Sequence, residues 1–181
     1  MKTLLIGLSI LGLTNLAHAQ NDTYVVNHVQ LKEIEATPNI NPIYFNAVHD
    51  KNASQQVEIL ETEVEHFDIT KSPIFTNTFE TYTMLFQTTD GSIMASYDEK
   101  GKLLNCVEKF ENVILPEKVL QTLQSNYPDW TLNKTTYRVN YYQGENVKKL
   151  YQVQIKNGED KMNLKIDCQG EILNHRNHNK L

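Results

Sequence analysis

The hydrophobic and polar positions of the chain follow a helical period twice, and each time a strand period comes next. The first helical stripe recurs at steps of three and four residues, at Val57, Leu60, Val64 and Phe67. The second has similar spacing, at Val119, Leu120, Leu123 and Tyr127. After each stripe the period changes to two, which is typical of strands with one apolar and one wet face. The pattern therefore predicts an α+β fold in which helices cover one face of an antiparallel sheet.

Local signals define the ends of these elements. Ser54 can serve as the N-cap of the first helix, and Pro116 falls in the first turn of the second, where its missing N–H is tolerated. Pro128 ends the second helix. The strands turn at two hairpin dipeptides, Asp90-Gly91 and Asn157-Gly158.

An internal repeat organises the chain. Residues 82–105 align without a gap with residues 151–174, and the alignment pairs Tyr82 with Tyr151, Asp98 with Asp167, and Gly101 with Gly170. We interpret this as a duplicated helix-plus-strands unit, the first copy at 51–110 and the second at 111–175. The second copy has a longer first hairpin, 130–141 and 147–156, with a bulge or bend expected near Lys134.

The segments outside the repeat have other characters. Residues 1–19 read as a secretory signal peptide, with Lys2, an apolar run and an Ala-His-Ala cleavage site ending at Ala19. Residues 20–50 read as an extended N-terminal arm that pairs onto a sheet edge or is partly disordered, and residues 176–181 as a polar tail. Nothing after the signal peptide is apolar enough to span a bilayer.

Composition narrows the function. With 181 residues and a net charge of −5, the chain suits one medium domain or two small repeats. The acidic balance argues against a nucleic-acid binder that relies on basic patches. Export leads to an oxidising compartment, so Cys106 and Cys168 could form a disulfide; alternatively they are buried free thiols.

The stretch from about residue 55 to 175 resembles the PepSY-like exported proteins of Bacteroidetes-type bacteria. The matching motifs are a D-x-x-G-K strand end at Asp98, Gly101 and Lys102, a Leu-Pro helix start at Leu115, and a Y-P-x-W helix end at Tyr127–Trp130. The resemblance implies a fold similar to that of beta-lactamase-inhibitor proteins, with tandem helix-plus-hairpin units forming a curved antiparallel sheet. It also implies a module that binds or restrains another protein outside the cytoplasm.

No catalytic, cofactor-binding or metal-binding signature appears in the sequence. Chains of this appearance are sometimes labelled nicotinate-nucleotide adenylyltransferase, but the H-x-G-H motif of that enzyme class is missing. Asp98 and Asp167 read as turn residues, and His175 and His178 as part of a polar tail. Glu61 and Glu65 share one helix face, which we interpret as solvated. The sequence therefore predicts no catalytic residue, no metal and no cofactor.

The long second hairpin is the candidate partner-binding element. Tyr137, Arg138, Tyr141 and Tyr142 place aromatic and guanidinium groups close together, and such residues dominate protein interfaces. The alternative is that Tyr137 and Tyr141 belong to the core. Two functions follow: a noncatalytic exported module that binds an extracytoplasmic protein, or a small-molecule carrier or unrecognised enzyme that uses a cavity between sheet and helices.

Overall fold

The computed structural model describes residues 23–27, 38–76 and 78–177. The signal peptide predicted at 1–19 and His178 in the predicted tail lie outside this range. The elements in chain order are β1 (Thr23–Asn27), α1 (Pro42–Val48), α2 (Gln55–His66), the 3-10 helix η1 (Ile69–Lys71), β2 (Thr81–Gln87), β3 (Gly91–Asp98), β4 (Leu103–Glu111), α3 (Glu117–Asn126), β5 (Thr131–Tyr142), β6 (Lys148–Asn157), β7 (Asp160–Asp167) and β8 (Ile172–Asn177).

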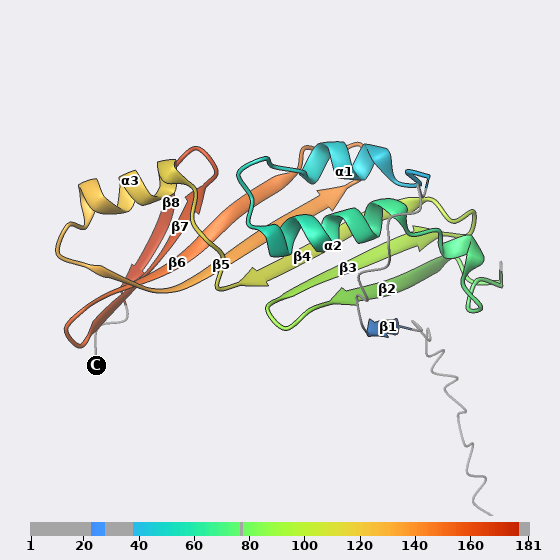
Figure 1. The fold of residues 1–181 in the computed structure, drawn as a ribbon, viewed down its shortest axis with the longest axis horizontal. Coiled ribbons are helices and arrows are strands. Elements are labelled where there is room, and N and C mark those ends of the chain that lie inside the picture. The colour runs from blue at the N-terminus through green and yellow to red at the C-terminus, as the bar shows by residue number, and fades with distance from the viewer. Residues whose placement is uncertain (1–22, 28–37, 77, 178–181) are drawn as a thin grey trace, which may run out of the picture.

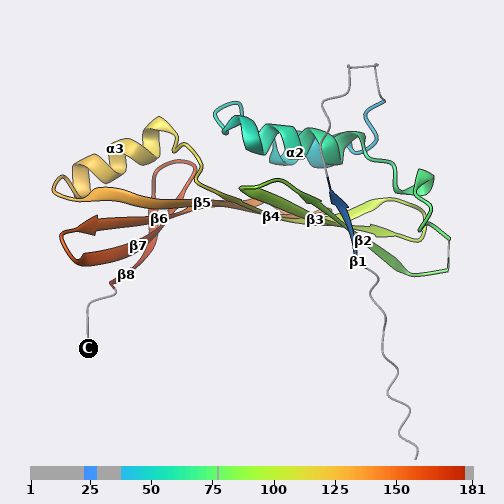
Figure 2. The ribbon, with the colours of Figure 1, turned by 60° about the horizontal axis from the view of Figure 1, so that its bottom comes forward.

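The eight strands form one sheet whose spatial order is their chain order. From β2 to β8 all neighbours are antiparallel, while β1 joins the outer edge of β2 in parallel. Strand β8 runs to Asn177, so His175 belongs to a strand rather than to a polar tail. Helices α1, α2 and α3 all lie on the same side of the sheet (Figures 1 and 2). The predicted α+β class, with helices on one face of an antiparallel sheet, is confirmed.

The two aligned turns have the same hydrogen bonds. One side-chain oxygen of Asp98 accepts from the backbone N–H groups of Lys100 and Lys102, and Asp167 does the same for Gln169 and Glu171. Both turns follow a register shift at aligned positions, between Ser96 and Tyr97 and between Lys165 and Ile166. The two segments therefore share backbone geometry, and Asp98 and Asp167 are turn residues as predicted. Their origin by duplication stays a prediction.

The long second hairpin also has the predicted irregularity. Its strands are β5 and β6, and their register shifts between Leu132 and Lys134. Asn133 is the extra residue of a bulge, which accounts for the change of apolar parity along the strand.

The predicted helices form, with differences at their ends. Val57, Leu60 and Val64 of α2 are buried against the sheet. Ser54 occupies the N-cap position of α2 without a side-chain cap hydrogen bond, and Pro116 is the N-cap of α3 rather than a residue of its first turn. Val119 and Leu123 are the buried residues of α3. Leu120, which the spacing assigns to the same apolar stripe, is 37% exposed.

The expectation of an extended arm at 20–50 is wrong for its last part. Pro42 starts helix α1, whose Tyr44 and Val48 are buried. The side-chain amide of Asn41 donates to the backbone oxygens of Val64 (2.7 Å) and Phe67 (2.9 Å) near the end of α2. These long-range bonds hold α1 beside α2, and such tertiary contacts leave no periodic signal in a seven-residue segment. The earlier part of the arm contains β1, which pairs with β2.

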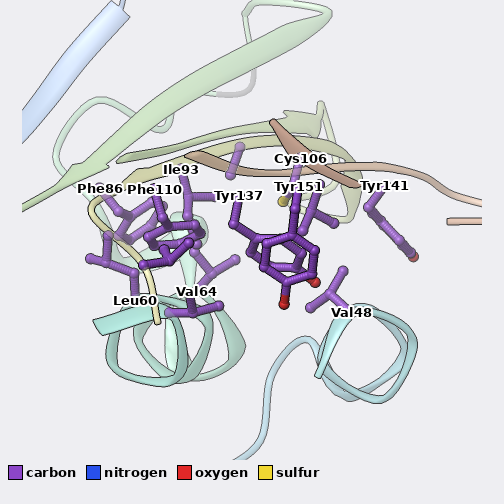
Figure 3. Close-up of a cluster of buried hydrophobic side chains, with 14 of the residues drawn as sticks. Val48, Leu60, Val64, Phe86, Ile93, Cys106, Phe110, Tyr137, Tyr141 and Tyr151 are labelled. Atoms are coloured by element: carbon purple, nitrogen blue, oxygen red, sulfur yellow. The ribbon is translucent and has the colours of Figure 1, made fainter. Parts of the chain in front are cut away.

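The core lies between the helices and the covered face of the sheet (Figure 3). Leu60 and Val64 of α2 lie over Phe86, Ile93 and Phe110 from neighbouring strands, and all are almost completely buried. A row of aromatic rings continues from β4 to β6: Phe110 stacks on Tyr137 with ring centroids 6.5 Å apart, and Tyr137 stacks on Tyr151 with centroids 4.7 Å apart. The core is therefore continuous from β2 to β6.

Helix α3 is held close to the β7–β8 turn by a glycine. Gly170 has φ of 88°, and a Cβ atom there would lie 2.8 Å from Thr122 Oγ1 and 2.9 Å from the Lys118 backbone oxygen of α3. Gly158 has φ of 56°, and a Cβ atom on it would have nothing within 4 Å. Both sites favour glycine, but only Gly170 is crowded as well.

We expect Gly170→Ala to destabilise the fold more than Gly158→Ala. The left-handed backbone alone costs roughly 1 kcal/mol for alanine, and the displacement of α3 should bring the cost at Gly170 to about 2 kcal/mol or more. Urea unfolding of the two variants measures the difference. Equal losses at the two sites would contradict close packing of α3 on this turn.

Candidate functional site

One face of the sheet carries no helix within the described part of the chain (Figure 2). Strand alternation decides which side chains it presents. On β5, Tyr137, Val139 and Tyr141 are buried toward the helices, while Arg138 and Tyr142 point to the other side. We call this uncovered side the open face.

The open face is hollowed over strands β4 to β7. A shallow depression of about 260 Å³ is lined by polar and charged side chains from these four strands: Lys109, Glu111, Lys134, Thr136, Arg138, Gln152, Gln154 and Asn163. Their functional groups are held by cross-strand hydrogen bonds, from Arg138 Nε to Gln152 Oε1 (3.1 Å) and from Gln154 Nε2 to Asn163 Oδ1 (3.0 Å). The depression is therefore a preformed polar surface.

Glu111 is the carboxylate of the depression. Lys109 Nζ lies 2.6 Å from one of its oxygens and Lys134 Nζ lies 3.3 Å from the other. These two hydrogen-bonded lysines lower the pKa of Glu111 below its usual value. With both oxygens engaged, Glu111 is ionised at neutral pH and offers little to the other cations on this face.

The structure separates the four predicted binding residues. Tyr137 and Tyr141 are only 1% and 4% exposed, so their assignment to a binding surface is wrong. Tyr137 stacks between Phe110 and Tyr151, and Tyr141 packs edge-on against Tyr44 of α1. Arg138 and Tyr142 remain on the open face, where Tyr142 is 46% exposed.

Two carboxylates lie buried on the opposite side, under the helices. Glu61 of α2 is 0% exposed and Glu108 of β4 is 1% exposed. Tyr44 donates a hydrogen bond to Glu108 Oε1 (2.8 Å), but Glu108 Oε2 and both oxygens of Glu61 have no hydrogen-bond partner. We call Glu61 and Glu108 the buried acidic pair.

Burial controls the protonation of this pair. Loss of hydration raises the pKa of Glu61 to about 7, opposed by the charge of Lys149 and reinforced by Asp50 and Glu58. Burial also raises the pKa of Glu108 well above its usual value, and the nearby Glu61 charge adds to the rise. Lys149 does not bond to either carboxylate; its Nζ donates to the Val48 backbone oxygen at the end of α1. The pair therefore holds protons at a pH where ordinary glutamates are ionised.

Sequence reasoning interpreted Glu61 and Glu65 as a solvated face, and this is wrong for both. Glu65 is only 6% exposed, and its backbone oxygen accepts from the N–H groups of Ile40 and Asn41. The reason is α1, which covers this side of α2 and was not expected as a helix. The burial of Glu108 could have been predicted from the sequence, because Glu108 alternates with Cys106 and Phe110 on the side of β4 that faces the helices.

The two cysteines are free thiols rather than a disulfide. Cys106 lies on β4, whereas Cys168 follows β7, and two strands separate β4 from β7. Three strand spacings amount to roughly 14 Å, twice the Cα separation that a disulfide allows. Burial raises the pKa of both thiols, most strongly that of Cys106, which makes them poor nucleophiles.

Neither a metal site nor a membrane-spanning helix is found among the described residues. No cluster of three or more His, Cys, Asp or Glu side chains there is arranged to hold a metal ion. None of the helices in the same part of the chain is long and apolar enough to cross a bilayer.

Comparison with known proteins gave structural neighbours alone. The chain matches no protein-family model, and no curated protein matches it. A DUF2874 family protein from Bacteroides ovatus shares 16% identity at a TM-score of 0.35, covering 54% of this chain and 70% of that one. Another DUF2874 family protein, from Bacteroides uniformis, shares 15% identity at a TM-score of 0.36, covering 54% of this chain and 71% of that one. A BLIP-like protein from Bacteroides fragilis shares 19% identity at a TM-score of 0.33, covering 56% of this chain and 70% of that one. At these identities and TM-scores the likenesses carry no information on function.

Proposed function

We propose that this chain is an exported, noncatalytic module that binds another protein through the open face of its sheet. The observation that carries the proposal is the contrast between the two faces: the three described helices cover one, and the other presents a preformed polar depression. Export is supported by the signal-peptide pattern of residues 1–19. The PepSY-like resemblance of the motifs points to the same kind of role.

The composition of the open face supports a protein partner. Leu85, Met94 and Val107 are register partners on β2, β3 and β4, and they form an apolar strip beside the depression. Met94 is 43% exposed. Interfaces combine an apolar centre with a polar rim and are enriched in Met, Tyr and Arg, all of which occur on this face.

Site-specific crosslinking tests the proposal. A photoreactive phenylalanine analogue is placed at Met94 or Tyr142 on the open face, or at Leu120 on the helix side as a control of similar exposure. After irradiation of cells that produce the full chain, adducts to one other protein should form from Met94 and Tyr142 and be weak or missing from Leu120. Equal adducts from all three positions, or adducts from Leu120 alone, would contradict the proposal that the open face binds the partner.

The buried acidic pair favours the second candidate, a carrier or an enzyme. Glu61 and Glu108 lie under the helices with three oxygens that accept no hydrogen bond, although His49 Nδ1 lies 3.9 Å from Glu61 Oε2. A bound small molecule that donates hydrogen bonds would satisfy those oxygens. Native mass spectrometry of the purified protein tests this: a bound mass that disappears in Glu61→Gln would support the second candidate, and a bare chain would count against it.

A further inference from the structure

We infer that the partner presents an acidic protein surface to the open face; the inference rests on the proposed function. Strand alternation places seven cations on the open face of β4 to β7 against two carboxylates, Glu111 and Asp167. The cations are Lys109, Lys134, Arg138, Lys148, Lys156, Lys161 and Lys165. The chain as a whole has a net charge of −5, so this basic face is opposite in sign to the rest of the molecule. The sequence-based argument against a nucleic-acid binder with basic patches rested on net charge, which does not reveal how the charges are distributed over the surface.

The cations are placed where the fold alone would disfavour them. Lys109 is the direct register partner of Arg138 across β4 and β5, and Lys156 is that of Lys161 across β6 and β7. Like charges directly opposite one another on a sheet face are destabilising. Two such pairs on one face are the pattern expected of a surface that is neutralised by an anionic partner.

The carboxylates of the chain leave most of these cations free. Among the described residues, both ion pairs on the open face are made by Glu111, with Lys109 and Lys134. Arg138 is held by an amide instead, through Nε to Gln152. A guanidinium carries five N–H donors in a fixed fork, so Arg138 keeps donors for a carboxylate of the partner in a bidentate pair.

A protein fits this surface better than other polyanions. The apolar strip Leu85–Met94–Val107 borders the basic region on the same face. Glutamine and asparagine amides line the depression between the cations. A folded partner with carboxylates beside apolar side chains matches both parts, whereas a sugar–phosphate backbone or a lipid headgroup layer matches only the charge.

Replacing basic residues by glutamate at two places on the surface distinguishes binding at the open face from a general effect of the protein's net charge. The probe is a short fluorescein-labelled glutamate-rich peptide, with its glutamine counterpart as the uncharged control. Arg138→Glu with Lys165→Glu reverses two charges and lowers the net charge of the open face of β4 to β7 from +5 to +1, and Lys51→Glu with Lys100→Glu makes the same change of net charge in exposed turns. Residue 138 lies opposite Lys109 in the β4–β5 register. The Arg138→Glu variant therefore gains an opposite-charge pair and should fold.

We expect fluorescence anisotropy to show binding of the glutamate peptide that weakens with salt, and no binding of the glutamine peptide. The open-face variant should bind at least about tenfold more weakly, while the turn variant should change less than about twofold. Equal weakening in both variants would overturn the inference. Tighter binding of duplex DNA or of phosphatidylglycerol vesicles, lost on the same reversal, would also overturn it in favour of another polyanion.

The crosslinked partner distinguishes this inference from the proposed function. If open-face adducts form but survive high salt and the Arg138/Lys165 reversal unchanged, the acidic partner is wrong and the proposed function stands. If no adducts form from the open face, the proposed function fails, whatever the peptide does.

Discussion

The folded protein should be more stable near pH 5 than near pH 8, with Glu61 alone contributing about 3 kcal/mol to the difference. Burial raises the pKa of Glu61 to about 7 in the folded chain, whereas an unfolded glutamate has a pKa of about 4.3. Each unit of pKa difference corresponds to about 1.4 kcal/mol. The buried acidic pair therefore makes this chain sensitive to a pH range in which most carboxylates no longer titrate.

The direction follows from proton counting. Between the unfolded and the folded pKa, the folded state holds a proton on Glu61 that the unfolded state has already lost. Stability is therefore fully present below the unfolded value, falls as the pH rises, and levels off above about pH 7. Glu108 shifts in the same direction and adds to the slope. Glu111 and Asp68, whose pKa values are lowered, act only in the more acidic range.

Glu61→Gln tests this, because the amide resembles the protonated carboxyl in shape and carries no charge. Urea unfolding near pH 8 should show the variant to be more stable than the unchanged protein, by up to about 4 kcal/mol, and near pH 5 by only about 1 kcal/mol. Glu99→Gln, in the exposed β3–β4 turn, is the control and should leave the pH dependence unaltered. A variant with the same pH dependence as the unchanged protein would show that Glu61 is hydrated in solution.

Phe110→Ala should cost the fold about 4 kcal/mol, the usual range for a large buried aromatic side chain being about 3–5 kcal/mol. Phe110 is 0% exposed and stacks on Tyr137 of β5. Its ring also covers Gly91 of β3, where a Cβ atom would come within 2.5 Å of it. Because Phe110 contacts both Gly91 of β3 and Tyr137 of β5, we expect that no single neighbour can shift to fill the cavity.

Met94→Ala is the matched comparison, since Met94 lies on β3 but faces the open side and is 43% exposed. The Met94→Ala variant should lose less than about 1 kcal/mol of unfolding free energy. Chemical unfolding followed by circular dichroism measures both variants. A similar loss for the two would mean that the open face is packed in solution, contrary to the proposed function.

The local parts of the fold could be predicted from the sequence. The turns at Asp98 and Asp167 and the bulge at Asn133 depend on residues within a few positions of one another, so patterns of glycine, aspartate and apolar parity were sufficient. The two longer helices were predicted for the same reason, because their apolar stripes are continuous.

The site could not be predicted in the same way, because it depends on tertiary contacts. Helix α1 has too few residues to show a period, and its absence from the prediction left Glu61 and Glu65 apparently solvated. Strand alternation puts Tyr137 and Tyr141 on one face and Tyr142 on the other, but only the position of the helices decides which of the two faces is buried. The basic character of the open face appears only when the register brings Lys109 to Arg138 and Lys156 to Lys161.

The strand order also governs how the sheet assembles in time. From β2 onward each strand pairs with the next one along the chain, mostly through short turns, and such local contacts permit fast folding. β1 is different, because Thr23 pairs with Thr83 and the intervening loop encloses α1 and α2. Closing that long loop costs the most entropy of any pairing in the sheet. We therefore expect the N-terminal strand to be the last to join a sheet that the rest of the chain has already built.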